Sequence, residues 1–307
     1  MKILPRFEIP KERSPALLGL SGDFDPARQL RMRWLGTAGY ELTAGKTTLL
    51  LDPFVSRPGL LKLLLSGKLK PDESASARYF PRADYVLTGH SHYDHLMDAP
   101  EIALRTGASV MGSESTCRVS AARGVPEDRI IHVPQTGVTK QLGDFEVRFV
   151  PSRHGKFFFG KVPADGEITS CPHGGHFSAS GYRMGGAFGI WMRVGDITLY
   201  HNGSADLIDM ELEGLQADVL IPGLAGRYAT RDYFQRLIGF LKPRWIVPTH
   251  YDAFFSPLES GLSLLPAINL RGFFREMERY APGAPIVMPE YEEAVTFSLG
   301  RAAARKA

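Results

Sequence analysis

Apolar and polar positions alternate over several short runs near the start of the chain. The runs from Arg31 to Leu35, Tyr40 to Thr43 and Thr47 to Leu51 are joined by glycine-containing turns, which is typical of paired β-strands. Further strand-like runs occur at 130–133, 145–150, 189–194, 197–200, 219–221 and 245–247. Apolar residues recur at helical spacing from Asp232 to Leu241 and from Leu270 to Tyr280, so we expect amphipathic helices there.

Composition limits the classes of protein that fit this pattern. The 307 residues, 44% of them hydrophobic, can bury a sizeable core, and the net charge of +3 gives no case for a nucleic-acid partner. Cys117 and Cys171 are far apart and form no C-x-x-C motif, so a disulfide framework is not indicated. The first residues lack a signal-peptide pattern and no apolar run approaches ~20 residues, so we expect a cytoplasmic protein without a membrane anchor.

The most informative segment follows an apolar run that ends at Thr88. It reads His90-Ser91-His92-Tyr93-Asp94-His95, with four metal-liganding side chains within six residues. Residues two apart on extended backbone point to the same side, so His90 and His92 can reach one ion. Asp94 and His95 open a predicted helix, where they can turn toward a second ion. We interpret this segment as a metal site.

Two further histidines each come directly after a strand-like run. His154 follows the run that ends at Pro151, and His250 follows the run that ends at Pro248. Residues just past strand ends are where α/β proteins build their sites. Either histidine alone would more often be structural, but together with the motif they complete a ligand set.

With these residues the chain resembles the metallo-β-lactamase superfamily over nearly its whole length. Within it, the chain is similar to the branch that includes L-ascorbate 6-phosphate lactonase and N-acyl-phosphatidylethanolamine phospholipase D. The resemblance rests on Trp34-Leu35-Gly36, Leu49 to Phe54, the motif from His90 to His95, His154, and Pro248 to Asp252.

The resemblance implies an α/β fold, a four-layer αβ/βα sandwich of two mixed β-sheets flanked by helices. We expect one domain over residues 1–307, with an N-terminal arm at 1–29 and insertions at 55–81 and 156–186. It also implies that His90, His92 and His154 hold a first metal ion. Asp94, His95 and His250 would hold a second.

One departure from the family concerns the carboxylate that usually bridges the two ions. In the run from Tyr200 to Asp206, Ser204 occupies the position where that aspartate is expected. A hydroxyl is a poor ligand beside a carboxylate, so the second ion would be held less firmly. Asp206 could turn inward as a substitute metal ligand, or it could cap the following turn, as short Asp side chains often do.

The two insertions suggest how the pocket is covered. Leu60 to Leu69 is dense in leucine and lysine, which could make an interfacial helix that touches lipid, or could pack as a lid or a subunit contact of a homo-oligomer. The second insertion contains His173 and His176, which we expect near the site, His176 as a catalytic proton donor and His173 as a substrate contact. Arg153 and Arg227 lie on predicted site loops and could bind an anionic group, or simply be solvated.

The chemistry expected from this ligand set is hydrolysis. Imidazoles with a carboxylate suit Zn²⁺, one or two per chain, although Mn²⁺ or Fe²⁺ also fit. An activated water would attack a small anionic ester, lactone or phosphodiester, and Asp94 would take its proton. A lipid phosphodiesterase of phospholipase D type and a non-catalytic binding protein remain the alternatives.

Overall fold

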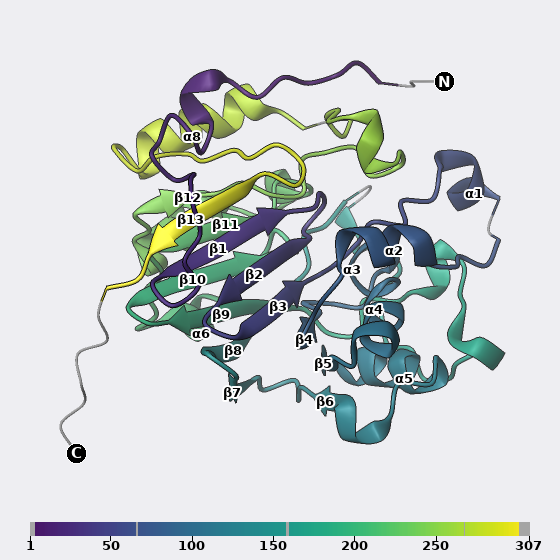
Figure 1. Cartoon of the computed structure of the whole chain (residues 1–307). Helices are drawn as coiled ribbons and strands as arrows, with labels where there is room; N and C mark the ends of the chain where they lie inside the picture. Colours follow the sequence, from purple (N-terminus) through teal and green to yellow (C-terminus); the bar gives the residue numbers. More distant parts are fainter. Residues whose placement is uncertain (1–3, 66, 158–159, 267, 301–307) are drawn as a thin grey trace.

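Two β-sheets form the centre of the protein. The computed structural model describes residues 4–65, 67–157, 160–266 and 268–300, and over these residues the strands form a seven-stranded and a six-stranded sheet (Figure 1). The first has the order β13-β1-β2-β3-β4-β5-β6: β13 (Ala294–Ser298), β1 (Gln29–Trp34), β2 (Tyr40–Ala44), β3 (Thr47–Leu51), β4 (Tyr85–Leu87), β5 (Ser109–Gly112) and β6 (Ile130–His132). The second has the order β12-β11-β10-β9-β8-β7: β12 (Trp245–Ile246), β11 (Val219–Pro222), β10 (Ile197–Asn202), β9 (Phe188–Val194), β8 (Phe145–Pro151) and β7 (Val138–Leu142).

Helices cover the outer faces of the two sheets. In Figure 1, α2, α4 and α5 lie beside the half of the first sheet that contains β3, β4 and β5, and α8 lies on the opposite side of the molecule. The α-helices are α1 (Leu60–Leu64), α2 (Glu73–Tyr79), α3 (Tyr93–Leu96), α4 (Ala99–Thr106), α5 (Glu114–Ala122), α6 (Asp209–Leu212), α7 (Tyr233–Leu241) and α8 (Leu270–Tyr280). The helices predicted at Asp232 to Leu241 and Leu270 to Tyr280 are therefore present, as α7 and α8.

Alternation along the strands separates two apolar cores. Leu49 and Leu51 of β3 point into the core between the sheets, whereas Leu50 points to the core beneath the helices. The same alternation puts Leu87 of β4 in the first core and Val86 in the second, because successive strand residues face opposite sides of a sheet. The predicted fold class, two mixed sheets flanked by helices, is confirmed.

Strand direction brings the predicted site residues to one edge of the sandwich. β3 and β4 are parallel, and so are β10, β11 and β12. Their carboxyl ends therefore lie together, and the loops that leave them carry the residues expected to bind metal.

The predicted helix that Asp94 and His95 open is a short one, α3, and a second helix, α4, begins directly after Asp98. The Asp98 carboxylate is buried and accepts hydrogen bonds from the backbone N–H groups of Val55 (2.7 Å) and Ser56 (2.9 Å). It also accepts one from the Ser56 hydroxyl (2.5 Å). Asp98 thus ties the first insertion, which contains α1 and α2, to the segment that follows the metal motif. Small parts of the predicted arm and insertions (1–3, 66 and 158–159) lie outside the described residues.

Candidate metal centre

Three histidines from two loops converge at the end of the sandwich. His90 and His92 follow β4, and His154 follows β8. One ring nitrogen from each can be chosen so that all three lie within 4.8 Å of one another, and each pair of ring centroids is 4.7 Å apart. All three side chains are buried. This is the first ligand group that the motif predicted.

Hydrogen bonds select the nitrogens that are free to bind an ion. His92 Nε2 lies 2.9 Å from the carbonyl of Pro163 and His154 Nδ1 lies 2.7 Å from the carbonyl of Gly155. A carbonyl can only accept, so these two nitrogens carry the protons and His92 Nδ1 and His154 Nε2 keep their lone pairs. His90 Nε2 is buried and has no hydrogen-bond partner among the described residues. Buried polar atoms are rarely left without a partner. A metal ion here would bind the free ring nitrogen of each of the three imidazoles.

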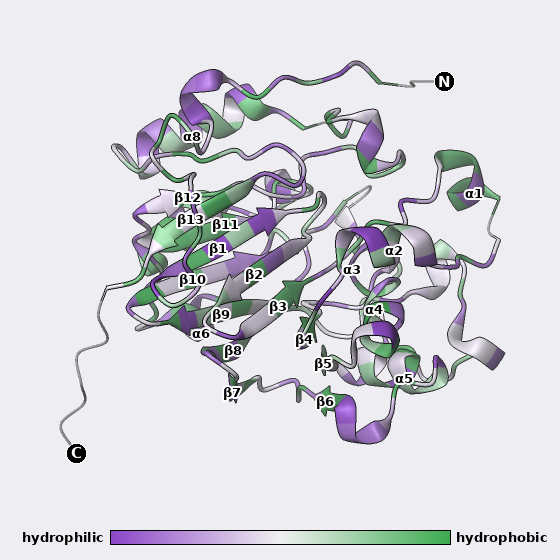
Figure 2. Cartoon of the chain, in the orientation of Figure 1, coloured by the Kyte–Doolittle hydropathy of each residue, from purple (hydrophilic) through white to green (hydrophobic). Residues whose placement is uncertain are grey.

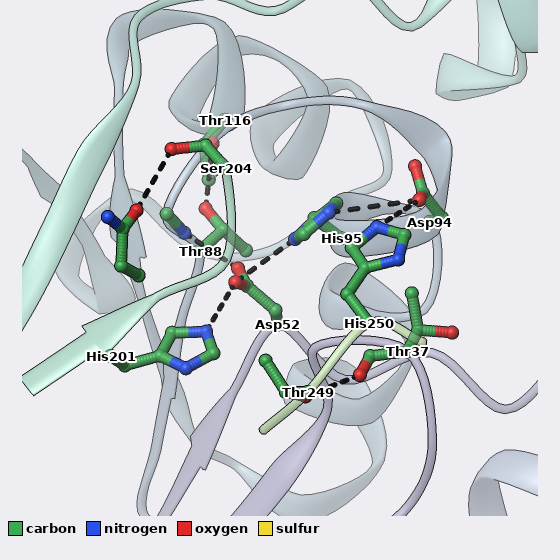
Figure 3. Close-up of polar contacts among 12 residues, drawn as sticks. Thr37, Asp52, Thr88, Asp94, His95, Thr116, His201, Ser204, Thr249 and His250 are labelled. Atoms are coloured by element: carbon green, nitrogen blue, oxygen red, sulfur yellow. Dashed lines mark hydrogen bonds and ion pairs between the residues drawn. The ribbon is translucent and has the colours of Figure 1, made fainter. Parts of the chain in front are cut away.

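A second group lies directly beside the first. Asp94 and His95 belong to α3, His250 follows β12, and ligand atoms of the three residues lie within 4.8 Å of one another. Asp94 Oδ2 is 3.3 Å from His250 Nε2 and 3.7 Å from His95 Nε2 (Figure 3). The rings of His90 and His95 are 3.8 Å apart between centroids, so the two groups form one continuous centre.

The electrostatics of the two groups differ. In the first group, burial lowers the pKa of all three histidines, that of His154 to about 3, which keeps their lone pairs available. In the second group, burial alone would lower the pKa of His95, but the carboxylates of Asp52 and Asp94 outweigh burial and raise it. An ion in the first group therefore meets neutral ligands, whereas an ion in the second group competes with a proton that His95 binds more firmly than a free imidazole does.

Asp52 is a buried supporting residue that the sequence analysis did not identify. It follows β3 and lies between two imidazoles, with Oδ2 3.0 Å from both His95 Nδ1 and His201 Nε2 (Figure 3). Its other oxygen accepts a hydrogen bond from the backbone N–H of Gly89 (2.7 Å). Burial would raise the pKa of Asp52, but the charges of His95 and His201 prevail and lower it, so this carboxylate stays ionised. Asp52 thus directs His95 Nε2 toward the metal position.

A second set of contacts fixes His250. Thr37 accepts hydrogen bonds at its carbonyl from the Thr249 hydroxyl (2.6 Å) and from the backbone N–H of His250 (2.8 Å). The N–H of Thr37 donates to Asp252 Oδ1 (2.8 Å), and Asp252 Oδ2 pairs with the buried guanidinium of Arg57 (2.5 Å). Four residues near the centre, Thr37, Asp52, Arg57 and His250, have positive φ between 38° and 53°, which is an unfavourable backbone conformation for a residue with a side chain.

The structure places Ser204 at the wall of the cavity beside the ligand groups. Its hydroxyl donates to the carbonyl of Arg153 (3.0 Å), so it is engaged by the backbone of the loop that carries His154. Asp206, the candidate substitute, uses Oδ1 to accept from the backbone N–H of Leu207 (2.8 Å) and is absent from the ligand groups found among the described residues.

The cavity above the two groups measures about 410 Å³. Besides the six ligands, its described wall is formed mainly by apolar side chains, with Ser180, Gly203 and Ser204 beside them. The apolar members are Tyr93, Phe157, Pro163, Ala164, Ala179, Ala225, Phe254 and Leu265. No lysine or arginine of the described residues lines it.

Four residues predicted to act in the pocket lie away from its wall. His176 contacts Arg123 of the α5 C-terminus, whose Nη1 donates to His176 Nδ1 (2.7 Å), and His173 is exposed. Arg153 is exposed as well, although it neighbours His154. Arg227 is buried, pairs with Glu276 of α8 (3.2 Å) and lies over the ring of Tyr228, so its charge is already compensated.

Comparison with known proteins agrees with this geometry. A family model described as a β-lactamase superfamily domain matches residues 31–250 of the chain. The chain belongs to the metallo-β-lactamase superfamily. A UPF0173 metal-dependent hydrolase from Anaeromyxobacter dehalogenans is 29% identical over 82% of this chain and 85% of that protein. One from Methanopyrus kandleri is 28% identical over 85% of this chain and 97% of that protein.

Solved structures show the same fold at lower sequence identity. Igni18, a metallo hydrolase from Ignicoccus hospitalis, superposes with a TM-score of 0.54 at 18% identity over 88% of this chain and 98% of that one. An isothiocyanate hydrolase from Delia radicum gut bacteria gives 0.55 at 14% identity over 88% of this chain and 99% of that one. This superfamily member is a metal-dependent hydrolase, and its structure brings together six side chains that could hold metal ions. The lactonase and phospholipase D branch stays a prediction.

Proposed function

We propose that this metallo-β-lactamase superfamily hydrolase cleaves an ester or lactone bond in a small, neutral and largely apolar molecule. The observation that carries the proposal is the apolar wall of the cavity above the ligand groups. A substrate that fills such a cavity gains from the burial of its hydrocarbon part, about 0.8 kcal/mol per methylene. A phosphodiester would have only the bound metal ions to balance its negative charge, because no lysine or arginine of the described residues lines the wall.

The expectation of an anionic substrate rested on three cationic residues of the predicted site loops, Arg153, Lys156 and Arg227. Two of these side chains are exposed, and the third is buried against Glu276, so none offers a free cation to the cavity. A neutral carbonyl compound fits the described wall better. Six converging ligand side chains also argue against the non-catalytic alternative, since a binding module gains nothing from maintaining them.

We further propose Zn²⁺ as the ion, because imidazole with a carboxylate is its usual ligand set in hydrolases. When bound, zinc polarises the substrate carbonyl and acidifies a water molecule. His90, His92 and His154 would hold the first ion, and Asp94, His95 and His250 the second, less firmly held one. The Asp94 carboxylate borders both the cavity and His250 Nε2 (3.3 Å), so it can orient the attacking water and take its proton. Tyr93 and Phe254 would contact the hydrocarbon part of the substrate.

The proposal is tested with zinc-loaded protein and three substrate series. These are p-nitrophenyl esters of increasing acyl length, aliphatic lactones, and bis(p-nitrophenyl) phosphate. Each methylene that enters the cavity should raise kcat/KM about fourfold until the cavity is full. A kcat/KM for the phosphodiester above that of every ester and lactone would refute the proposal.

A matched pair of variants locates the binding surface. The Phe254 ring lines the cavity, whereas the adjacent Phe255 lies outside that wall. Phe254→Ala should flatten the dependence of kcat/KM on acyl length, and Phe255→Ala should leave it intact. The same flattening in both variants would show that the cavity is not where the acyl chain binds.

A further inference from the structure

Helix α1 carries a stripe of exposed leucines. Leu61, Leu64 and Leu65 are 71%, 77% and 71% exposed, and their i, i+3, i+4 spacing puts them on one face. In Figure 2, α1 is strongly hydrophobic and stands out from the rest of the molecule. Single exposed leucines are ordinary on a protein surface, but three on one helical turn form a patch that usually meets another surface.

The leucine stripe (Leu61, Leu64 and Leu65) is not the face by which α1 packs. Leu63, between them in sequence, is half-buried and packs against the core beneath the helices. Beside the stripe lies a separate cavity of about 470 Å³, whose wall includes Leu60, Phe255 and Pro266. The wall also includes Ser256, Ser260 and Ser263, so the stripe borders a hollow of mixed character, with apolar side chains on the α1 side.

The charges around α1 indicate the kind of surface it meets. Lys62, Lys68 and Lys70 are exposed, and the ion pairs found among the described residues include none of them. No acidic residue occurs between Phe54 and Asp72, so this segment is uniformly basic. Leucines flanked by lysines are typical of helices that lie in the headgroup region of an anionic membrane, where each lysine contributes about 1 kcal/mol.

We propose that α1 docks this protein on an anionic lipid surface. The leucine stripe enters the boundary between headgroups and acyl chains, and the three lysines contact lipid phosphates. The contact is peripheral: none of the helices formed by the described residues is long and apolar enough to cross a bilayer. Phe254 and Phe255, whose ring centroids are 4.8 Å apart, line the catalytic cavity and the α1 cavity respectively, so docking brings the catalytic cavity close to the lipid.

The experiment is flotation of the purified full-length protein with vesicles, and it needs no hydrolytic activity, so its outcome is independent of the proposed function. Vesicles of phosphatidylcholine mixed with phosphatidylglycerol are compared with vesicles of phosphatidylcholine alone, at low and high salt. We expect binding to the mixed vesicles that weakens with salt. Absence of binding to mixed vesicles at low salt would overturn the proposal, as would equal binding to both kinds.

Variants assign the binding to α1. Changing Leu61, Leu64 and Leu65 together to Ser should weaken vesicle binding by about tenfold per leucine. Met210→Ser is the matched control, because Met210 is 80% exposed on a different helix and should leave binding unchanged.

Two further measurements separate lipid from a protein partner. Changing Lys62, Lys68 and Lys70 to Gln leaves the leucine stripe intact and should remove the preference for phosphatidylglycerol. This variant tests the proposal even if the variant with three serines fails to fold. Unchanged flotation of the triple serine variant would refute the docking role. A dimer in light scattering that this variant abolishes would instead show that a second copy of the chain covers the stripe.

Discussion

Replacing Asp52 by Asn tests how the centre is held together. The substitution keeps the shape of the side chain but turns one carboxylate oxygen into an NH2 group. Three donors depend on that carboxylate: Gly89 N on Oδ1 (2.7 Å), and His95 Nδ1 and His201 Nε2 on Oδ2 (both 3.0 Å). Whichever way the amide is turned, its NH2 group faces a donor instead of accepting from it. A buried donor without an acceptor costs about 1–3 kcal/mol, so the free energy of unfolding should fall by that amount.

The same change should weaken the second ion more than the first. Asp52 holds His95, which belongs to the second ligand group, and it contacts no histidine of the first. Loss of such a supporting carboxylate typically lowers metal affinity about 10- to 100-fold, equivalent to about 1.4–2.7 kcal/mol. The assay is elemental analysis of protein equilibrated with chelator-buffered Zn²⁺, which gives a separate occupancy curve for each ion. The second curve should move to higher free zinc while the first stays in place.

Asp98→Asn is the control for this measurement. Asp98 is buried as completely as Asp52 and also accepts several hydrogen bonds, but its partners are Val55 and Ser56 of the first insertion. Asp98→Asn should lower stability without moving either occupancy curve. An unmoved second curve in Asp52→Asn, or an equal shift in both variants, would refute the idea that Asp52 orients a metal ligand.

Three other outcomes follow from the site and its surroundings. Ser204→Asp should restore the bridging carboxylate and raise the zinc content of protein purified without added metal from about one ion toward two; unchanged content by elemental analysis would show that position 204 does not face the ions. His92→Ala should abolish ester hydrolysis, whereas His176→Ala, outside the cavity wall, should keep a near-normal kcat/KM; comparable losses would return His176 to the catalytic set. Arg57→Ala leaves the buried Asp252 carboxylate without its cation and should lower the free energy of unfolding, measured in urea, by about 3–5 kcal/mol. Arg78→Ala breaks the exposed pair with Glu259 and should cost at most about 1 kcal/mol; equal effects would contradict the importance of burial.

The ligand set could be predicted because its signals are local. The motif from His90 to His95 is contiguous, and His154 and His250 each follow a strand-like run whose end faces the same edge of the sandwich. Asp52 also follows such a run, so the same rule would have found it. Its role, however, depends on His201, which lies 149 positions away in the sequence and reaches it only in the fold.

Other features had no local signal. Arg227 follows a glycine-rich loop near the site, but its direction is set by Glu276 and Asn269, which lie 49 and 42 positions further along the chain. Strand β7 was not predicted, because Thr139, Lys140 and Gln141 are exposed and polar and show no alternation. Its place in the sheet comes from pairing with β8, which a pattern of apolar residues cannot reveal.

The positive-φ backbone around the centre has a consequence for how this protein can evolve. A left-handed conformation costs a residue with a side chain about 1–2 kcal/mol, so Thr37, Asp52, Arg57 and His250 together keep the native state several kcal/mol less stable than relaxed backbone would. Glycine would relieve that strain at each position but would remove a side chain that supports or binds the ions. At Asp52 and Arg57 the gain is offset by the buried partners that glycine would leave unpaired. Selection for thermal stability alone should therefore accumulate glycine at Thr37 and His250 in laboratory evolution, and catalysis would be lost with His250 before the fold is.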